Sequence, residues 1–234
     1  MIVSTYRPYF APFPGFFMKA MLSDILVLLD CVQFPRGSTW LNRNRFKNDQ
    51  GTYWMTVPVW KKGLGLQRID EIRICNEGGW AEKFLLSLKS AYSKAPFFRD
   101  HLSFLEGVFS DPPDRLLDLN LRIIRHIMTH LDIRTRIVLL SELHIEEKEP
   151  GLSVAICREL GGSRFLAQRS ALKFLPGEGF LRANIRMRLI NLRPLVYPQL
   201  WGGFIPNLSA LDLLFTCGPG ARGIMEKGLP GTNA

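Results

Sequence analysis

The stretch Ile25-Leu26-Val27-Leu28-Leu29, followed directly by Asp30, decides the fold. Five consecutive apolar residues have the length of a strand, and their lack of alternation predicts a strand covered by helices on both faces. A second strand is expected at residues 2–4, and a short helix starting near Phe16 would join the two. Strand, helix and strand in this order predict adjacent parallel strands at the start of a doubly wound sheet.

The rest of the chain extends this beginning. Residues 52–57 and 68–74 alternate between apolar and polar positions, which predicts antiparallel strands with one solvated face. From about residue 79 to 131 the apolar spacing is helical. Further strands are expected at 135–139, 164–168 and 185–190. The prediction is an α/β fold with a mostly parallel, Rossmann-like sheet, an antiparallel β addition and a helical insertion, all in one domain of residues 1–234 with a frayed tail at 228–234.

Charge and composition restrict the possible partners. The 234 residues carry a net charge of +9, which favours an anionic partner such as a nucleotide sugar, a nucleic acid or a lipid-phosphate surface. No apolar run approaches the ~18–20 residues of a membrane helix, and the N-terminus does not read as a signal peptide, so a cytoplasmic location is expected. The four cysteines lack CxxC spacing, so they indicate neither disulfides nor zinc.

Two candidate site segments lie where predicted strands end. Arg7 and Tyr9 follow the first strand, where an α/β sheet binds its ligands, so Arg7 could bind a phosphate and Tyr9 could stack on a base or sugar. The alternative is a rigid aromatic–proline turn. Asp30 and Gln33 follow the second strand. Asp30 is the candidate general base, and the alternative is a carboxylate that caps nearby amides.

Of two further motifs, one favours a ligand site and the other does not favour a metal site. Asn42-Arg43-Asn44-Arg45 would direct its arginines to one face of a strand and its asparagines to the other, so one pair could meet an anion while the second supports it. A solvated turn is the alternative. His126 and His130 have the spacing of a metal pair on a helix, but no third ligand is suggested, so no metal is predicted. No cofactor is indicated.

Several segments resemble the WbqC-like family in order and spacing. They are Pro8-Tyr9, Pro12, Gly15, Val32-Gln33-Phe34, the Asn42–Arg45 motif, and residues 54–59, 91–98, 197–199 and 208–215. The last two bring Gln199 and Asp212 into the candidate site. One departure is clear, because Tyr6-Arg7 stands where the family usually has His-Gln. A catalytic role of that histidine in relatives would be lost or altered here.

The resemblance implies a role in O-antigen or other surface-polysaccharide biosynthesis. The leading hypothesis is an enzyme that modifies a nucleotide-linked sugar or transfers a group onto it. The expected ligand contacts are Arg7, Tyr9, Gln33, Asn42, Arg43, Arg45, Gln199 and Asp212, with Asp30 as the catalytic group. A protein that binds a nucleotide sugar or another anion without turnover is the main alternative, and a nucleic-acid-binding domain is a further one.

Overall fold

The structure is a computed structural model that describes residues 1–173, 175, 177–193 and 195–230. Five strands form one parallel sheet in the order β5-β2-β1-β6-β7. They are β1 (Ile2–Tyr6), β2 (Ile25–Leu28), β5 (Arg136–Leu139), β6 (Arg164–Gln168) and β7 (Arg186–Ile190). The predicted parallel pairing of the first two strands is confirmed, with Val3 opposite Ile25.

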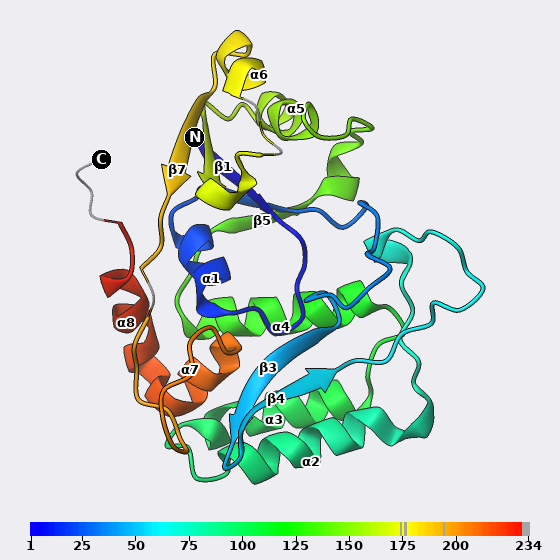
Figure 1. Cartoon of the computed structure of the whole chain (residues 1–234), viewed down its shortest axis with the longest axis vertical. Coiled ribbons are helices and arrows are strands. Elements are labelled where there is room, and N and C mark those ends of the chain that lie inside the picture. Colours follow the sequence, from blue (N-terminus) through cyan, green and yellow to red (C-terminus); the bar gives the residue numbers. More distant parts are fainter. Residues whose placement is uncertain (174, 176, 194, 231–234) are drawn as a thin grey trace.

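Helices cover both faces of this sheet, which explains the unbroken apolar sequence of β2. Leu26 and Leu28 face a core shared with α1 (Pro14–Met21) and α4 (Leu116–His130). Ile25 and Val27 face the other way, toward α5 (Leu152–Glu159) and α6 (Gly177–Arg182). Figure 1 shows α1 and α4 on one side of the sheet and α5 and α6 on the other.

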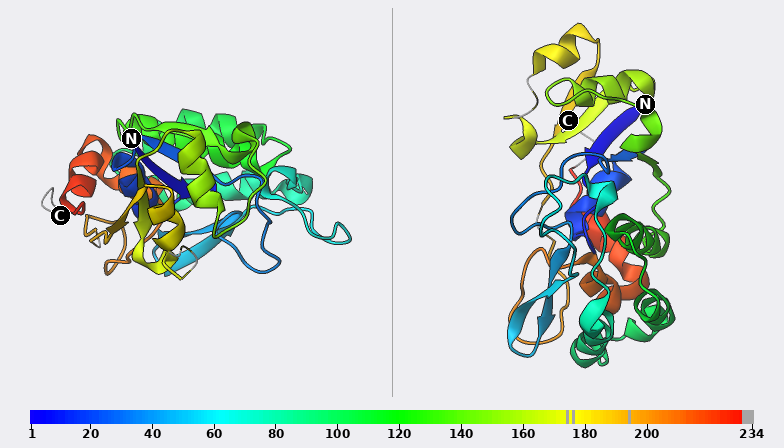
Figure 2. Two further views of the ribbon diagram at one scale, coloured as in Figure 1. Left: turned by 90° about the horizontal axis from the view of Figure 1, so that it is seen from above. Right: turned by 90° about the vertical axis from the view of Figure 1, so that its right-hand side faces the viewer.

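The antiparallel addition is a hairpin of β3 (Arg43–Asn48) and β4 (Gly51–Thr56), separate from the main sheet. It lies against the helical insertion, which consists of α2 (Trp80–Tyr92), α3 (Phe98–Ser110) and α4. The chain ends with α7 (Ala210–Cys217) and α8 (Ala221–Lys227). Figure 2 shows the hairpin and α6 at opposite ends of the molecule. The predicted α/β class, β addition and helical insertion are confirmed.

One local prediction is wrong. Residues 68–74 do not form a strand: Ile69–Glu71 is a 3-10 turn, and Arg68, Arg73 and Ile74 make isolated bridges. The apparent alternation arises because Ile69, Ile72 and Ile74 are buried from a loop. In the predicted frayed tail, Leu229 packs against the core, while residues 231–234 lie outside the described residues.

The topology determines on which face of the sheet the chain continues after each strand. The chain leaves β1 toward β2 through α1 on one face, and leaves β6 toward β7 through α6 on the other. Ligands of open α/β sheets bind at such a reversal, outside the carboxyl ends of the strands. Among the helices of the described residues, none has the length and apolar character needed to cross a membrane.

Candidate functional site

A cavity of about 670 Å³, here called the sheet-edge cavity, opens at the carboxyl ends of β1, β2 and β5. Arg7 enters it directly after β1, and Cys31 and Gln33 enter it after β2. Residues 146–149, in the connection from β5 to α5, also line it and carry three glutamates. Cation and carboxylates therefore line the same space, which suits a ligand with both phosphate and hydroxyl groups.

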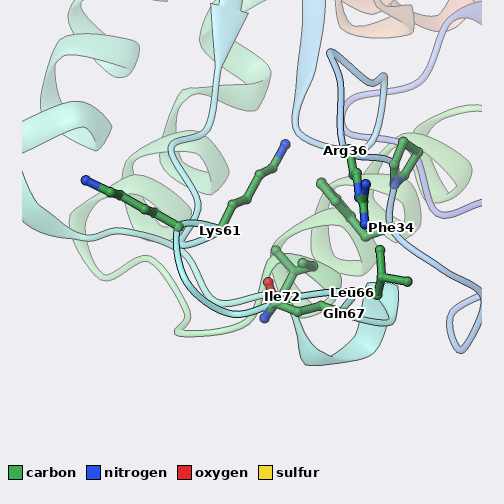
Figure 3. A pocket seen from close by; sticks show the side chains of 9 residues that line it. Phe34, Arg36, Lys61, Leu66, Gln67 and Ile72 are labelled. Atoms are coloured by element: carbon green, nitrogen blue, oxygen red, sulfur yellow. The ribbon is translucent and has the colours of Figure 1, made fainter.

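A second cavity of about 510 Å³, here called the basic cavity, shares Leu66 and Gln67 with the first. Figure 3 shows Phe34 and Arg36 on one wall and Lys61 on another, with Leu66, Gln67 and Ile72 below. Its lining residues include Arg36, Lys61 and Lys62 and no acidic residue. Partial burial lowers the pKa of Lys61. The basic cavity thus places positive charge next to the sheet-edge cavity.

Backbone pairing holds the two cavities together. Gln33 forms an antiparallel bridge with Arg68, and the Phe34 amide donates to the Gln67 carbonyl at 2.9 Å. The side chain of Arg68 is in turn oriented by Asp70, whose two carboxylate oxygens accept from Nε and Nη2. Segments 33–34 and 67–68 therefore form a shared wall of fixed geometry.

Amide side chains fix the aromatic–proline loop that carries Arg7. Asn44 Nδ2 donates to the carbonyls of Phe10 and Ala11, at 3.0 and 2.6 Å, and Asn120 Nδ2 donates to the Pro8 carbonyl at 2.8 Å. Both asparagines are buried. Buried hydrogen bonds therefore position this loop, which carries Arg7 into the lining of the cavity.

The two tyrosines of the loop differ. Tyr6 is buried, and its ring stacks on Phe16 with a centroid separation of 4.8 Å, so the residue that replaces the family's histidine belongs to the core. Tyr9 is half-buried and lies 5.9 Å from the Tyr6 ring. Burial raises the pKa of Tyr9, while the charge of Arg7 lowers it. The charge of Arg7 therefore acts on the hydroxyl of Tyr9.

Asp30 is 1% exposed and makes two contacts with one residue. Its Oδ1 accepts from the Ser141 amide at 3.0 Å and its Oδ2 accepts from Ser141 Oγ at 2.6 Å. These bonds fix the 3-10 turn Leu140–Leu143 to the end of β2. The arrangement matches the capping alternative. A role as general base stays a prediction.

The Asn42–Arg45 motif has the predicted division between the faces of its strand. Asn42 and Asn44 are buried, and Asn42 Nδ2 donates to the Val57 carbonyl at 2.9 Å. The Arg43 guanidinium lies 3.8 Å from the centroid of the Trp54 ring. Arg45 Nη2 donates to the carbonyls of Pro206 and Asn207, at 3.0 Å each. Neither arginine lines the cavity of Arg7, so the structure does not bring the three together there.

Gln199 and Asp212 belong to a polar network in the interior. Gln199 Oε1 accepts from Lys47 Nζ at 3.2 Å and from the Ile205 amide at 2.9 Å. Asp212 is completely buried, and its Oδ2 accepts from the Tyr92 hydroxyl at 2.8 Å. Burial raises the pKa of Asp212, while the hydrogen bond from Tyr92 and the charge of Lys47 lower it. These residues join β3, α2 and α7 and line neither cavity.

A third cavity of about 370 Å³ lies where α1 begins and where β6 and β7 end. Gly15, Gln168, Arg169 and Arg193 are among its lining residues. It is smaller than the two adjoining cavities and offers a competing location for an anion at the same edge of the sheet.

Sequence reasoning missed part of the site. Lys61-Lys62 is visible in the sequence as a basic pair, but nothing places it beside Phe34 and Arg36. Residues 146–149 are far along the chain, and only the pairing of β5 beside β2 brings them near Arg7. The acidic run in this segment was the one available signal.

Comparisons with known proteins agree with the resemblance seen in the sequence. The WbqC-like protein family matches residues 7–224. A protein of Mycobacterium tuberculosis named "Uncharacterized protein Rv1507c" is 29% identical over 218 residues, which cover 92% of this chain and 94% of that protein. No solved structure matches the chain at a significant level. The matched range includes the loop of Arg7, both adjoining cavities and α7, and the chain belongs to the WbqC-like family, which is associated with O-antigen gene clusters.

Proposed function

We propose that the protein is an enzyme of O-antigen or surface-polysaccharide biosynthesis that modifies a nucleotide-linked sugar or transfers a group onto it. The observation that carries this proposal is that the basic cavity adjoins the sheet-edge cavity, since both are lined by Leu66 and Gln67. Volumes of about 510 and 670 Å³ lie within the usual range for small-molecule sites. A diphosphate-linked sugar needs such a space, with cations for one part and hydrogen-bond acceptors for the other.

The charges suggest how the ligand is oriented. Arg36, Lys61 and Lys62 would neutralise the phosphates, and the Lys61 ammonium lies over the Phe34 ring, 4.6 Å from its centroid. The glutamates of residues 146–149 would accept hydrogen bonds from sugar hydroxyls. Arg7 lines the sheet-edge cavity and would contact a phosphate there. Gln33, whose neighbour Phe34 lines the basic cavity, would bind near the junction.

Binding without turnover is the second candidate. The carboxylate of Asp30 accepts two hydrogen bonds from Ser141, and Tyr6 is packed into the core. Both observations favour a structural role for these two residues. If the protein is an enzyme, the glutamates that line the sheet-edge cavity are further candidate bases beside Asp30.

A ligand panel separates these candidates. Thermal shift and calorimetry would compare UDP-, GDP-, CMP- and dTDP-linked sugars with the matching nucleotides, the free sugars and a short single-stranded oligonucleotide. The proposal expects a nucleotide sugar to bind more tightly than its nucleotide or its sugar alone. Tightest binding to the oligonucleotide would contradict it. Incubation with the selected ligand and analysis by mass spectrometry then distinguish turnover from binding.

A further inference from the structure

Three of the four histidines gather at one place in the helical insertion. His126 and His130 lie one turn apart at the end of α4, and His101 faces them from the first turn of α3. One ligand nitrogen from each ring lies within 4.8 Å of the other two. The ring centroids are separated by 5.1 Å (His101 and His126), 4.6 Å (His101 and His130) and 4.2 Å (His126 and His130).

Packing holds two of the rings firmly. His101 is 2% exposed and lies 5.6 Å, between ring centroids, from Phe215. The His126 ring stacks on Phe104 with a centroid separation of 3.6 Å and an interplanar angle of 4°. His130 is exposed and remains free to adjust its ring. Two fixed ligands and one adjustable ligand at the surface can close around an ion that enters from solvent.

Hydrogen bonding indicates which nitrogen of His130 is available. Its Nδ1 lies 2.9 Å from the carbonyl oxygen of His126. A carbonyl only accepts, so Nδ1 carries the proton and the lone pair lies on Nε2. A bond from one ring nitrogen to a backbone carbonyl is the usual way in which a metal-binding histidine is oriented.

The contact between the other two rings is close to the spacing of two metal ligands. His101 Nδ1 and His126 Nε2 are 2.9 Å apart. Two nitrogens bound to one tetrahedral Zn²⁺ lie about 3.3 Å apart, given Zn–N bonds of about 2.0–2.1 Å. The two nitrogens would therefore have to move apart by only a few tenths of an ångström to bind one ion. A single shared proton accounts for this pair but leaves Nε2 of His130 unused.

We propose that His101, His126 and His130 bind one divalent transition-metal ion of the Zn²⁺ type. Three neutral imidazoles suit Zn²⁺, Ni²⁺ and Cu²⁺ and disfavour Mg²⁺ and Ca²⁺, which prefer oxygen ligands. The fourth position faces solvent beside His130 and takes a water. The ion joins the beginning of α3 to the end of α4 and so stabilises the helical insertion. This site is independent of the cavities at the sheet edge.

The test uses the full chain, stripped with a chelator and dialysed. Calorimetric titration with ZnCl₂ should give one ion per chain, and Zn²⁺ should raise the unfolding temperature. His130→Ala should weaken Zn²⁺ binding by more than about 100-fold. Changing a residue that only hydrogen-bonds to a metal ligand usually costs about 100-fold at most, so a larger loss would mark His130 as a ligand itself. This variant should fold normally because His130 is exposed. His144→Asn is the matched control, since His144 is the remaining histidine, is exposed and has a positive φ of 51° that Asn tolerates. It should bind as the wild type does.

Titration with Co²⁺ provides a second readout that reports on the ligands. Four-coordinate nitrogen ligation gives visible absorption without a thiolate charge-transfer band, and His130→Ala should abolish it. A thiolate band would assign the ion to the cysteines and overturn the proposal. Unchanged Zn²⁺ affinity in His130→Ala, or no stoichiometric binding in the wild type, would overturn it as well.

Discussion

Replacing Asp30 by Asn tests whether this carboxylate organises the fold or takes part in chemistry. The carboxylate accepts two hydrogen bonds from Ser141 at a position that is 1% exposed. A hydrogen bond to a charged group contributes about 1.5–3 kcal/mol, and one between neutral groups about 0.5–1.5 kcal/mol. The amide of Asn can still pair with Ser141 but lacks the charge. Asp30→Asn should therefore lower the free energy of unfolding by about 1–2 kcal/mol.

A larger loss is expected for Asp30→Ala, which leaves the amide and hydroxyl of Ser141 without their acceptor and should cost about 3 kcal/mol or more. Urea unfolding followed by circular dichroism measures each value. Ser141→Ala completes a double-mutant cycle with Asp30→Ala, and a coupling energy of roughly 1–3 kcal/mol is expected for residues in direct contact.

The same variants separate organisation from catalysis. If Asp30 organises the 3-10 turn, turnover of any substrate found in the ligand panel should survive in Asp30→Asn. If Asp30 is a general base, turnover should fall by roughly 10²–10⁴-fold, with ligand affinity retained within about tenfold. Unchanged stability together with lost turnover would refute the organising role.

Two further predictions concern buried polar groups. Burial lowers the pKa of Lys19 from 10.5 to about 7, so between these values the unfolded chain binds the extra proton and the stability of the wild type rises with pH. Unfolding curves measured from pH 7.5 to 9.5 should show that the free energy of unfolding rises by up to about 1.4 kcal/mol per pH unit. Lys19→Met should remove this rise. The same dependence of the unfolding free energy on pH in both proteins would refute the pKa shift. Tyr92→Phe removes the donor to Asp212 and the acceptor of the Lys47 amide, so it should cost about 1–3 kcal/mol of unfolding free energy, and a loss below about 0.5 kcal/mol would contradict the network.

The sequence was informative where one local pattern determines the structure. The unbroken apolar run of β2 is typical of a strand covered on both faces, and together with the strand and helix before it the run predicted the parallel sheet. The alternation of Arg43 and Arg45 with asparagines likewise predicted that the two pairs lie on opposite faces of the strand. The strand predicted at residues 68–74 was wrong, because a loop that buries Ile69, Ile72 and Ile74 gives the same alternation of apolar and polar residues as a strand.

Contacts between distant segments could not be predicted in this way. His101 lies 25 residues before His126, and only the packing of α3 on α4 brings His101 Nδ1 to 2.9 Å from His126 Nε2. The family resemblance placed Gln199 and Asp212 in the site, whereas the structure places them in a network with Lys47 and Tyr92. Motif residues can recur in a family because they hold its loops and helices together, so a motif alone does not identify a ligand contact.

The most direct test of the proposed function is calorimetry of the best nucleotide sugar from the panel with three variants. Arg7→Ala and Lys61→Ala should each weaken binding by roughly tenfold or more and reduce its dependence on salt, since each removes a charged contact worth about 1.5–3 kcal/mol. Lys83→Ala makes the same charge change on the exposed surface of α2 and should bind as the wild type does. Equal affinity in these four proteins would contradict binding across the two adjoining cavities, and so would a loss seen only in an additional variant, Arg193→Ala of the third cavity.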